Sequence, residues 1–169
     1  MGYTHHEKIA VSGGIYSYTK GTKDSETAIS LQFGVVSIAD AATYQVLSAN
    51  SGKIHVIPGL SADIVITLPT AEAGLVYTFI YSGVAQDAQD WSFDTGADAN
   101  YFLGGVTGLD DDDGDCTVIY PDGNSNSIVK IDTPNAGSKV ELICADGTTW
   151  ILNAVVVSGT DTHSAFADQ

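Results

Sequence analysis

The stretch YQVLSANSGKIHVIPGLSADIVITLPTAEAGLVYTFI, from Tyr44 to Ile80, decides the fold of this chain. Runs rich in Ile, Val, Thr and Tyr alternate there with Ser-Gly, Pro-Gly and Pro-Thr-Ala-Glu-Ala-Gly punctuation. Runs of β-branched and aromatic residues that are bounded by turn residues are typical of strands. We therefore predict three successive strands, at Ile54–Ile57, Ile64–Leu68 and Val76–Ile80.

The same pattern continues downstream to residue 157. Asp146-Gly147 is a strong two-residue hairpin signal, and Asp122-Gly123 is a second turn candidate. Helical periodicity is almost absent, and we expect only single helical turns near Ile38–Ala42 and Thr70–Ala73. About ten short strands at regular spacing predict an all-β chain, folded as a β-sandwich or a jelly-roll-like barrel. The further strands are expected at Trp91–Thr95, Tyr101–Val106, Cys116–Tyr120, Ser127–Asp132, Lys139–Cys144 and Thr149–Val157.

The charge balance argues against several classes of partner. The chain has 169 residues, with 21 acidic residues, six lysines, no arginine and a formal net charge of −15. Nucleic-acid binding depends on Lys and Arg to neutralise phosphates, so we expect no nucleic-acid partner. Anionic membranes are disfavoured for the same reason, and no apolar run approaches the roughly 20 residues of a spanning helix. The start of the chain has no pattern of a secretion signal, so we expect synthesis in a cytoplasm.

The first 43 residues differ from the rest. They hold two β-like runs, Ile9–Tyr18 and Ala28–Ser37, which are too short to enclose a core of their own. We expect an extended arm at residues 1–43, a compact β domain at 44–158 and a loose tail at 159–169. The arm's apolar and aromatic side chains would be buried against another protein, because aromatic residues dominate such contacts. The candidates are Tyr3, Ile9, Val11, Ile15, Tyr16 and Tyr18.

An acidic run, Asp110–Asp113 with Asp115, is the most conspicuous chemical feature. Clustered carboxylates offer the oxygen ligands that Ca²⁺ prefers. The run does not fit a helix-loop-helix calcium loop, because aligning Gly114 with that loop's glycine places Leu109 and Tyr120 at ligand positions. We favour a solvated loop that keeps the surface soluble, and expect no cofactor. A metal site stays open as the alternative, with Asp110, Asp112, Asp113 and Asp115 as its candidate ligands.

The other reactive side chains do not suggest catalysis. The four histidines have no Ser, Cys or Asp partner in a recognisable arrangement, so we expect no enzyme. Cys116 and Cys144 lie in strand-like runs and are expected to be small buried hydrophobic residues, while a disulfide would need an oxidising environment. Trp91 and Trp150 fit either a packed core, which we favour, or a row of aromatic rings that stacks on sugars.

Four motifs, in a fixed order, give the chain a family resemblance. Ser51–Lys53 (SGK) opens a strand, Val65–Pro69 (VITLP) ends the next, Ala73–Ile80 (AGLVYTFI) holds the third, and Asp146–Trp150 (DGTTW) closes a hairpin. Together they resemble a domain of tailed-phage virion structural proteins, whose known members decorate capsids or form head and tail fibres. The chain departs from the family pattern at its acidic run, Gly108–Asp115, and at its N-terminal arm.

The resemblance implies a structural virion protein. It implies a homotrimer that binds the major capsid protein on the outer surface of the virion, as a capsid decoration or cement protein. The apolar second faces of the strands would then be subunit contacts. A head- or tail-fibre module is the nearest alternative, and a carbohydrate-binding adhesion domain and then a hydrolase follow. The candidate subunit contacts are Val76, Phe79, Ile151 and Val155.

Overall fold

The computed structural model describes residues 10–11, 14–15, 34–124, 126–159 and 164–169. The chain divides into two units, residues 1–32 and residues 33–169. In the first unit, the short strands β1 (Ala10–Val11) and β2 (Gly14–Ile15) pair antiparallel. The second unit holds all the other strands that the structure describes, and it carries the features discussed below.

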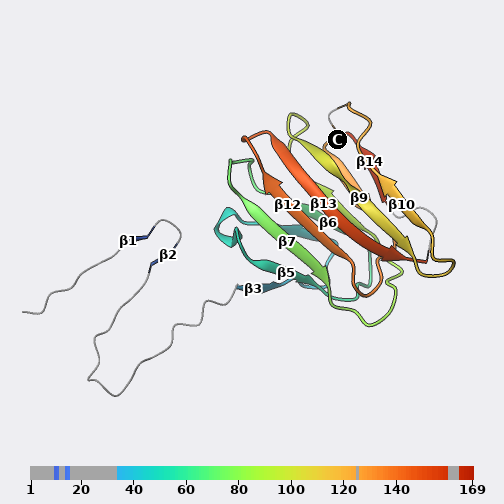
Figure 1. The fold of residues 1–169 in the computed structure, drawn as a ribbon. Helices are drawn as coiled ribbons and strands as arrows, with labels where there is room; N and C mark the ends of the chain where they lie inside the picture. Colours follow the sequence, from blue (N-terminus) through green and yellow to red (C-terminus); the bar gives the residue numbers. More distant parts are fainter. Residues whose placement is uncertain (1–9, 12–13, 16–33, 125, 160–163) are drawn as a thin grey trace, which may run out of the picture. The chain divides into compact units, whose positions relative to one another are not determined.

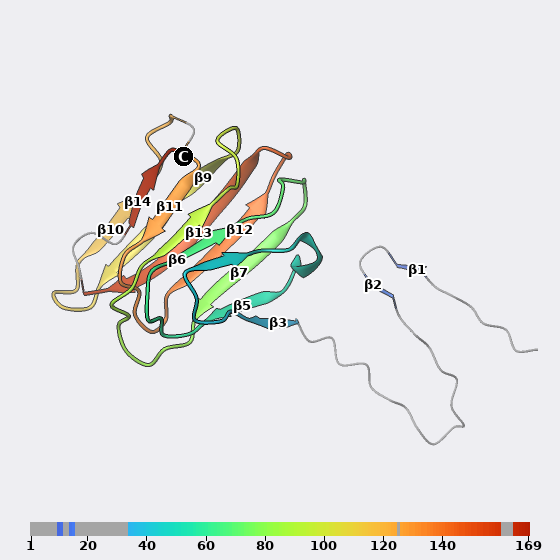
Figure 2. The same cartoon turned by 180° about the vertical axis from the view of Figure 1, so that it is seen from behind.

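The second unit is an all-β sandwich of two mixed sheets, as the sequence predicts. Figure 1 views it from the side of the seven-stranded sheet, and Figure 2 from the side of the five-stranded sheet. In spatial order, the seven-stranded sheet contains β10 (Cys116–Ile119), β9 (Tyr101–Asp110), β13 (Thr149–Ser158), β12 (Lys139–Cys144), β7 (Val76–Tyr81), β5 (Ile54–Ile57) and β3 (Val35–Ser37). The five-stranded sheet contains β14 (Ser164–Ala167), β11 (Ile128–Ile131), β8 (Trp91–Asp94), β6 (Ile64–Thr67) and β4 (Thr43–Gln45).

The core lies between the two sheets and is rich in aromatic rings. Along β7, the side chains of Tyr77, Phe79 and Tyr81 are buried, while the residues between them are not. Phe79 meets Phe93 of the facing sheet with ring centroids 4.9 Å apart, and Tyr81 meets Trp91 at 5.8 Å. Burying one such side chain is worth about 1.5–3 kcal/mol, so these contacts hold the sheets together. Trp91 and Trp150 are both fully buried, which confirms the core interpretation of the two tryptophans.

The compact unit begins earlier than the sequence predicts. Strand β3 pairs parallel with β5, and β4 pairs parallel with β6, so residues 35–43 belong to the sandwich and not to an arm. The expectation of a loose tail is also wrong for residues 164–169. There β14 pairs with β11, and the Gln169 N–H donates to Ser127 Oγ at 2.9 Å. These pairings join segments far apart in sequence, and short edge strands carry no strong local signal.

The expected helical turns at residues 38–42 and 70–73 are not formed. A single 3₁₀ turn, η1 (Ser48–Asn50), lies between β4 and β5 instead. A hairpin does form at Asp146-Gly147 between β12 and β13, but its loop is longer than the predicted two residues, because the ladder ends at the pair Cys144–Trp150 and the Ala145 N–H donates to the Thr149 carbonyl at 2.9 Å. There the Asp146 carboxylate accepts hydrogen bonds from the N–H groups of Thr148 (3.0 Å) and Thr149 (2.8 Å), which lower the pKa of Asp146. Gly147 has φ 90°, a conformation that favours glycine.

The two cysteines have different surroundings. Both are free thiols. Cys144 is buried in the core, as expected, whereas Cys116 is exposed, so the expectation that it is buried is wrong. Cys116 is the first residue of β10, which lies at the edge of its sheet. An edge strand has a neighbouring strand on one side only, so its side chains are less covered than those of a central strand.

Candidate interaction surface

The outward side chains of the seven-stranded sheet form an apolar surface, which we call the outer face. Four of them stand in register across β7, β12, β13 and β9. Their exposed fractions lie between 38% and 47%, which is high for large aliphatic side chains on central strands. The result is an unbroken apolar row across four neighbouring strands, near the end of the sheet that carries the β12–β13 turn. The row consists of Val76, Ile143, Ile151 and Leu103.

The outer face extends beyond this row to both edges of the sheet. Val35 of β3 pairs with outward-facing Ile54 at one edge, and Leu109 and Val118 face outward on β9 and β10 at the other. Tyr120 continues the alternation of β10, with its Cβ beside the outward position Gly105. Among the described residues, eleven large hydrophobic side chains are exposed, and only Leu47, Val65 and Val84 lie elsewhere. Eight of the eleven therefore gather on one face.

Charge is scarce on the outer face. Its ion pair joins Lys139 Nζ to Glu141 Oε1 at 3.2 Å, between the apolar row and the end of β7. A shallow hollow of about 370 Å³ lies beside this pair, and Lys53 contributes to its wall. Lys53 and Lys139 are two of the three lysines that follow residue 33, in a chain with a net charge of −15. The outer face thus avoids the acidic character of the rest of the surface.

The opposite side of the sandwich is polar. Lys130 of β11 lies between Asp90 (2.6 Å) and Asp132 (3.0 Å), and these carboxylates raise the pKa of the lysine. Asp94 also faces outward on β8, where its Oδ1 accepts a hydrogen bond from Gly96 N–H at 2.7 Å. Val65, 39% exposed, is the one large hydrophobic residue of β6 on this side that is exposed. The two sides of the sandwich therefore differ in chemistry.

Three of the four predicted subunit contacts lie on the outer face. Val76 and Ile151 belong to the apolar row, and Val155 is half-buried on the same side of β13. The prediction for Phe79 is wrong, since its side chain is fully buried between the sheets and cannot face another subunit. The reason is the period of two along a strand: Phe79 lies three residues from Val76, so the two side chains point to opposite faces.

The candidate contacts of the arm fall mostly outside the described residues. Tyr3, Ile9, Tyr16 and Tyr18 lie there, and Val11 and Ile15 belong to β1 and β2. Their role in binding another protein stays a prediction.

The acidic run forms the turn of the β9–β10 hairpin. Asp110 is buried, and its Oδ1 accepts the Asp112 N–H at 2.8 Å, while Asp113 Oδ1 accepts the Asp115 N–H at 3.1 Å. Two of the carboxylates therefore shape the turn, a role that the sequence did not indicate. Within the described ranges, no three His, Cys, Asp or Glu side chains are grouped to hold a metal ion.

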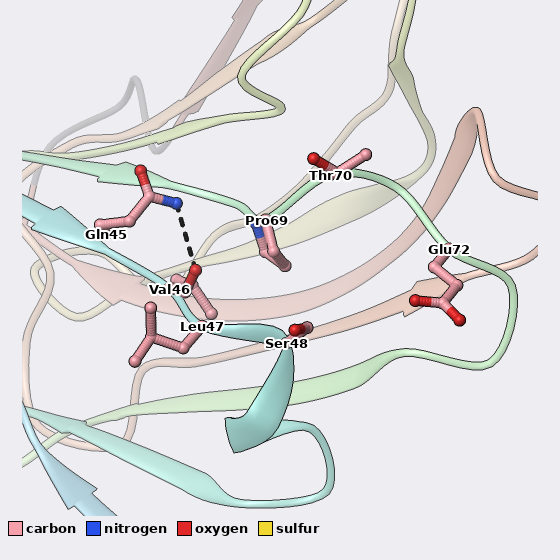
Figure 3. A pocket seen from close by; sticks show the side chains of 7 residues that line it. All are labelled: Gln45, Val46, Leu47, Ser48, Pro69, Thr70 and Glu72. Atoms are coloured by element: carbon pink, nitrogen blue, oxygen red, sulfur yellow. Dashed lines mark hydrogen bonds between the residues drawn. The ribbon is translucent and has the colours of Figure 1, made fainter.

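A second hollow, of about 300 Å³, lies beside β4 (Figure 3). The Gln45 amide spans part of it and donates to the Val46 carbonyl at 3.1 Å. Glu72 is the one charged side chain among the lining residues. A single carboxylate has no partner here for acid–base chemistry, and we assign no reaction to this hollow. The other lining residues are Leu47, Ser48, Pro69 and Thr70.

Comparison with protein-family models and with curated proteins finds no match for this chain. No helix in the described part of the chain is long and apolar enough to span a membrane.

Proposed function

We propose that this chain is a structural virion protein, a decoration or cement protein that binds the outer capsid shell of a tailed phage as a homotrimer. The observation that carries the proposal is the outer face, where eight of eleven exposed large hydrophobic side chains gather. Exposed apolar surface of this extent marks a site of protein association. The resemblance of residues 51–80 and 146–150 to phage structural proteins supplies the type of assembly.

The chemistry of the two sides of the sandwich supports subunit assembly through the outer face. Copies of a chain with a net charge of −15 repel one another unless the surfaces that meet carry little charge. The outer face meets this condition, because Lys139 neutralises Glu141 and Lys53 lies nearby. Its width also suits an interface, since seven strands about 4.8 Å apart span roughly 30 Å. A typical interface buries about 800 Å² on each partner.

The two tryptophans favour this proposal over sugar binding. A sugar-binding platform uses exposed aromatic rings, but Trp91 and Trp150 are fully buried. In the proposed assembly, the sandwich projects from the shell while the residues before Phe33 attach to the capsid protein. Attachment of this kind uses backbone hydrogen bonds to add a strand to a partner's sheet. Such a clamp would oppose rupture of the shell by packaged DNA without any catalysis.

Two aspartate substitutions test the assembly. Ile151→Asp places a charge in the apolar row, and Val65→Asp places the same charge on the opposite sheet at nearly equal exposure, 38% against 39%. By sedimentation equilibrium, we expect trimers for the parent and for Val65→Asp, and monomers for Ile151→Asp, with cooperative unfolding retained in all three. A monomeric parent, or a trimeric Ile151→Asp, would overturn the assembly. A trimer that does not bind expanded empty capsids would favour the fibre alternative.

A further inference from the structure

β10 is an edge strand, and on one of its sides no strand of the described residues pairs with it. In the described part of the chain, β10 pairs with β9 and with no other strand. The Asp110 N–H donates to the Asp115 carbonyl at 2.9 Å, so this pair is hydrogen-bonded. Hydrogen-bonded and non-hydrogen-bonded pairs alternate along an antiparallel ladder. Thr117 and Ile119 therefore direct their backbone groups toward β9, and Val118 directs its N–H and C=O to the free side.

Within the described residues, this edge carries few of the features that keep edge strands from pairing. Proteins protect exposed edges with charged residues, proline, bulges or a covering segment. Residues 116–120, CTVIY, contain no charge and no proline, and Val118 and Tyr120 are 62% and 72% exposed. Pro121 follows only where the strand has ended. The edge is thus a template for an added strand with apolar side chains.

Charge at one end of the edge selects the occupant. The turn that precedes β10 carries Asp111, Asp112, Asp113 and Asp115, all exposed. A strand added to β10 has one of its ends beside these carboxylates. Lys or Arg at that end would be attracted, whereas an acidic segment would be repelled. The sandwich of a second copy, in which residues 33–169 hold three lysines and 18 acidic residues, therefore fits the edge poorly.

We propose that β10 is a docking edge for an extended segment of another protein, with alternating apolar residues and a basic end beside the Asp111–Asp115 turn. Added antiparallel, the segment would place its C-terminal end at the turn, because β10 runs away from it. The inference rests on the proposed function only for the source of the segment, a subunit of the shell. Backbone hydrogen bonds between β10 and the segment supply the binding affinity, and the charge of the Asp111–Asp115 turn sets the direction in which the segment lies along β10.

The test uses a fluorescein-labelled synthetic peptide, Ser-Val-Thr-Val-Thr-Val-Thr-Lys-Lys-amide, and the full chain, with fluorescence anisotropy as the readout. A matched peptide ends in Glu-Glu. The critical variant is Val118→Pro, which removes the free N–H but no hydrogen bond to β9, and Val118→Thr is its control because it keeps the N–H. If the proline variant does not fold, Val118→Lys replaces it as an edge-blocking charge.

We expect saturable binding of the Lys peptide to the parent and to Val118→Thr, and binding at least about tenfold weaker for Val118→Pro. The Glu peptide should bind more weakly than the Lys peptide, and Asp112→Asn with Asp113→Asn should reduce the difference. Equal binding by Val118→Pro, equal binding of both peptides, or no binding of the Lys peptide overturns the inference. Peptide binding without capsid binding contradicts the proposed function alone.

Discussion

His55 should make the fold sensitive to mild acid. It is fully buried in β5, with ring centroids 4.8 Å from Phe79, 5.7 Å from Tyr77 and 6.1 Å from Tyr44. Within the described residues, neither ring nitrogen makes a hydrogen bond of normal geometry. Burial is the main reason that the pKa of His55 is lowered from 6.5, with the Lys53 charge acting in the same direction. The nearby carbonyls of Lys53 and Thr78 act against this.

The sign and size of the effect follow from proton linkage. Because the folded-state pKa of His55 lies below 6.5, the unfolded chain binds more protons than the folded chain as pH falls through that value. The free energy of unfolding should therefore fall below about pH 6.5, with a contribution of up to about 1.4 kcal/mol per pH unit from one proton. His55→Phe keeps an aromatic ring among the same neighbours and removes this contribution.

Urea denaturation between pH 5 and 8 measures the effect, with fluorescence of the buried Trp91 and Trp150 as the signal. Titration of the carboxylates contributes equally to the free energy of unfolding of both proteins. This contribution cancels when one pH profile is subtracted from the other. Below about pH 6.5, we expect the free energy of unfolding to fall more steeply with pH in the parent than in His55→Phe. The two slopes should differ by up to about 1.4 kcal/mol per pH unit. Parallel profiles across this range would refute the argument that a buried, poorly partnered imidazole resists protonation.

Three further predictions concern the core, the acidic turn and the arm. Phe79→Ala should lower the free energy of unfolding by about 3–5 kcal/mol, because it opens a cavity between the sheets; a loss below about 1 kcal/mol in urea denaturation would contradict its central position. The thermal midpoint should be independent of calcium in the parent and after Asn replaces Asp110–Asp113; a calcium-dependent rise that the replacement abolishes would restore the metal site. Deletion of residues 1–32 should leave a folded domain that no longer binds expanded empty capsids, as measured by co-sedimentation; parental occupancy by the truncated chain would end the attachment role of the arm.

Local patterns in the sequence predict most of the strands. The runs at Ile54–Ile57 and Val76–Ile80 carry enough β-branched and aromatic residues to be recognised alone, and Asp146-Gly147 identifies its hairpin. The order of strands within each sheet is not local. The parallel pairing of β13 with β9 joins residues about fifty positions apart, and nothing in either segment encodes the other.

The candidate site was only partly predictable for the same reason. Alternation along β7 and β13 could identify Val76 and Ile151 as outward residues, and strict use of the period would have excluded Phe79. The apolar row itself was hidden, because Ile143 and Leu103 join it only through the registers of β12 and β9. Sequence alone shows which side chains share a face of one strand, and the sheet decides which strands share a surface.

Imaging of purified phage particles with and without this chain tests the proposed function most directly. We predict threefold-symmetric density at threefold or quasi-threefold positions on the outer shell, present with the chain and absent without it. The sandwiches within each projection should meet through the seven-stranded sheet. Identical shells in the two preparations, or isolated single-copy projections, would contradict the account.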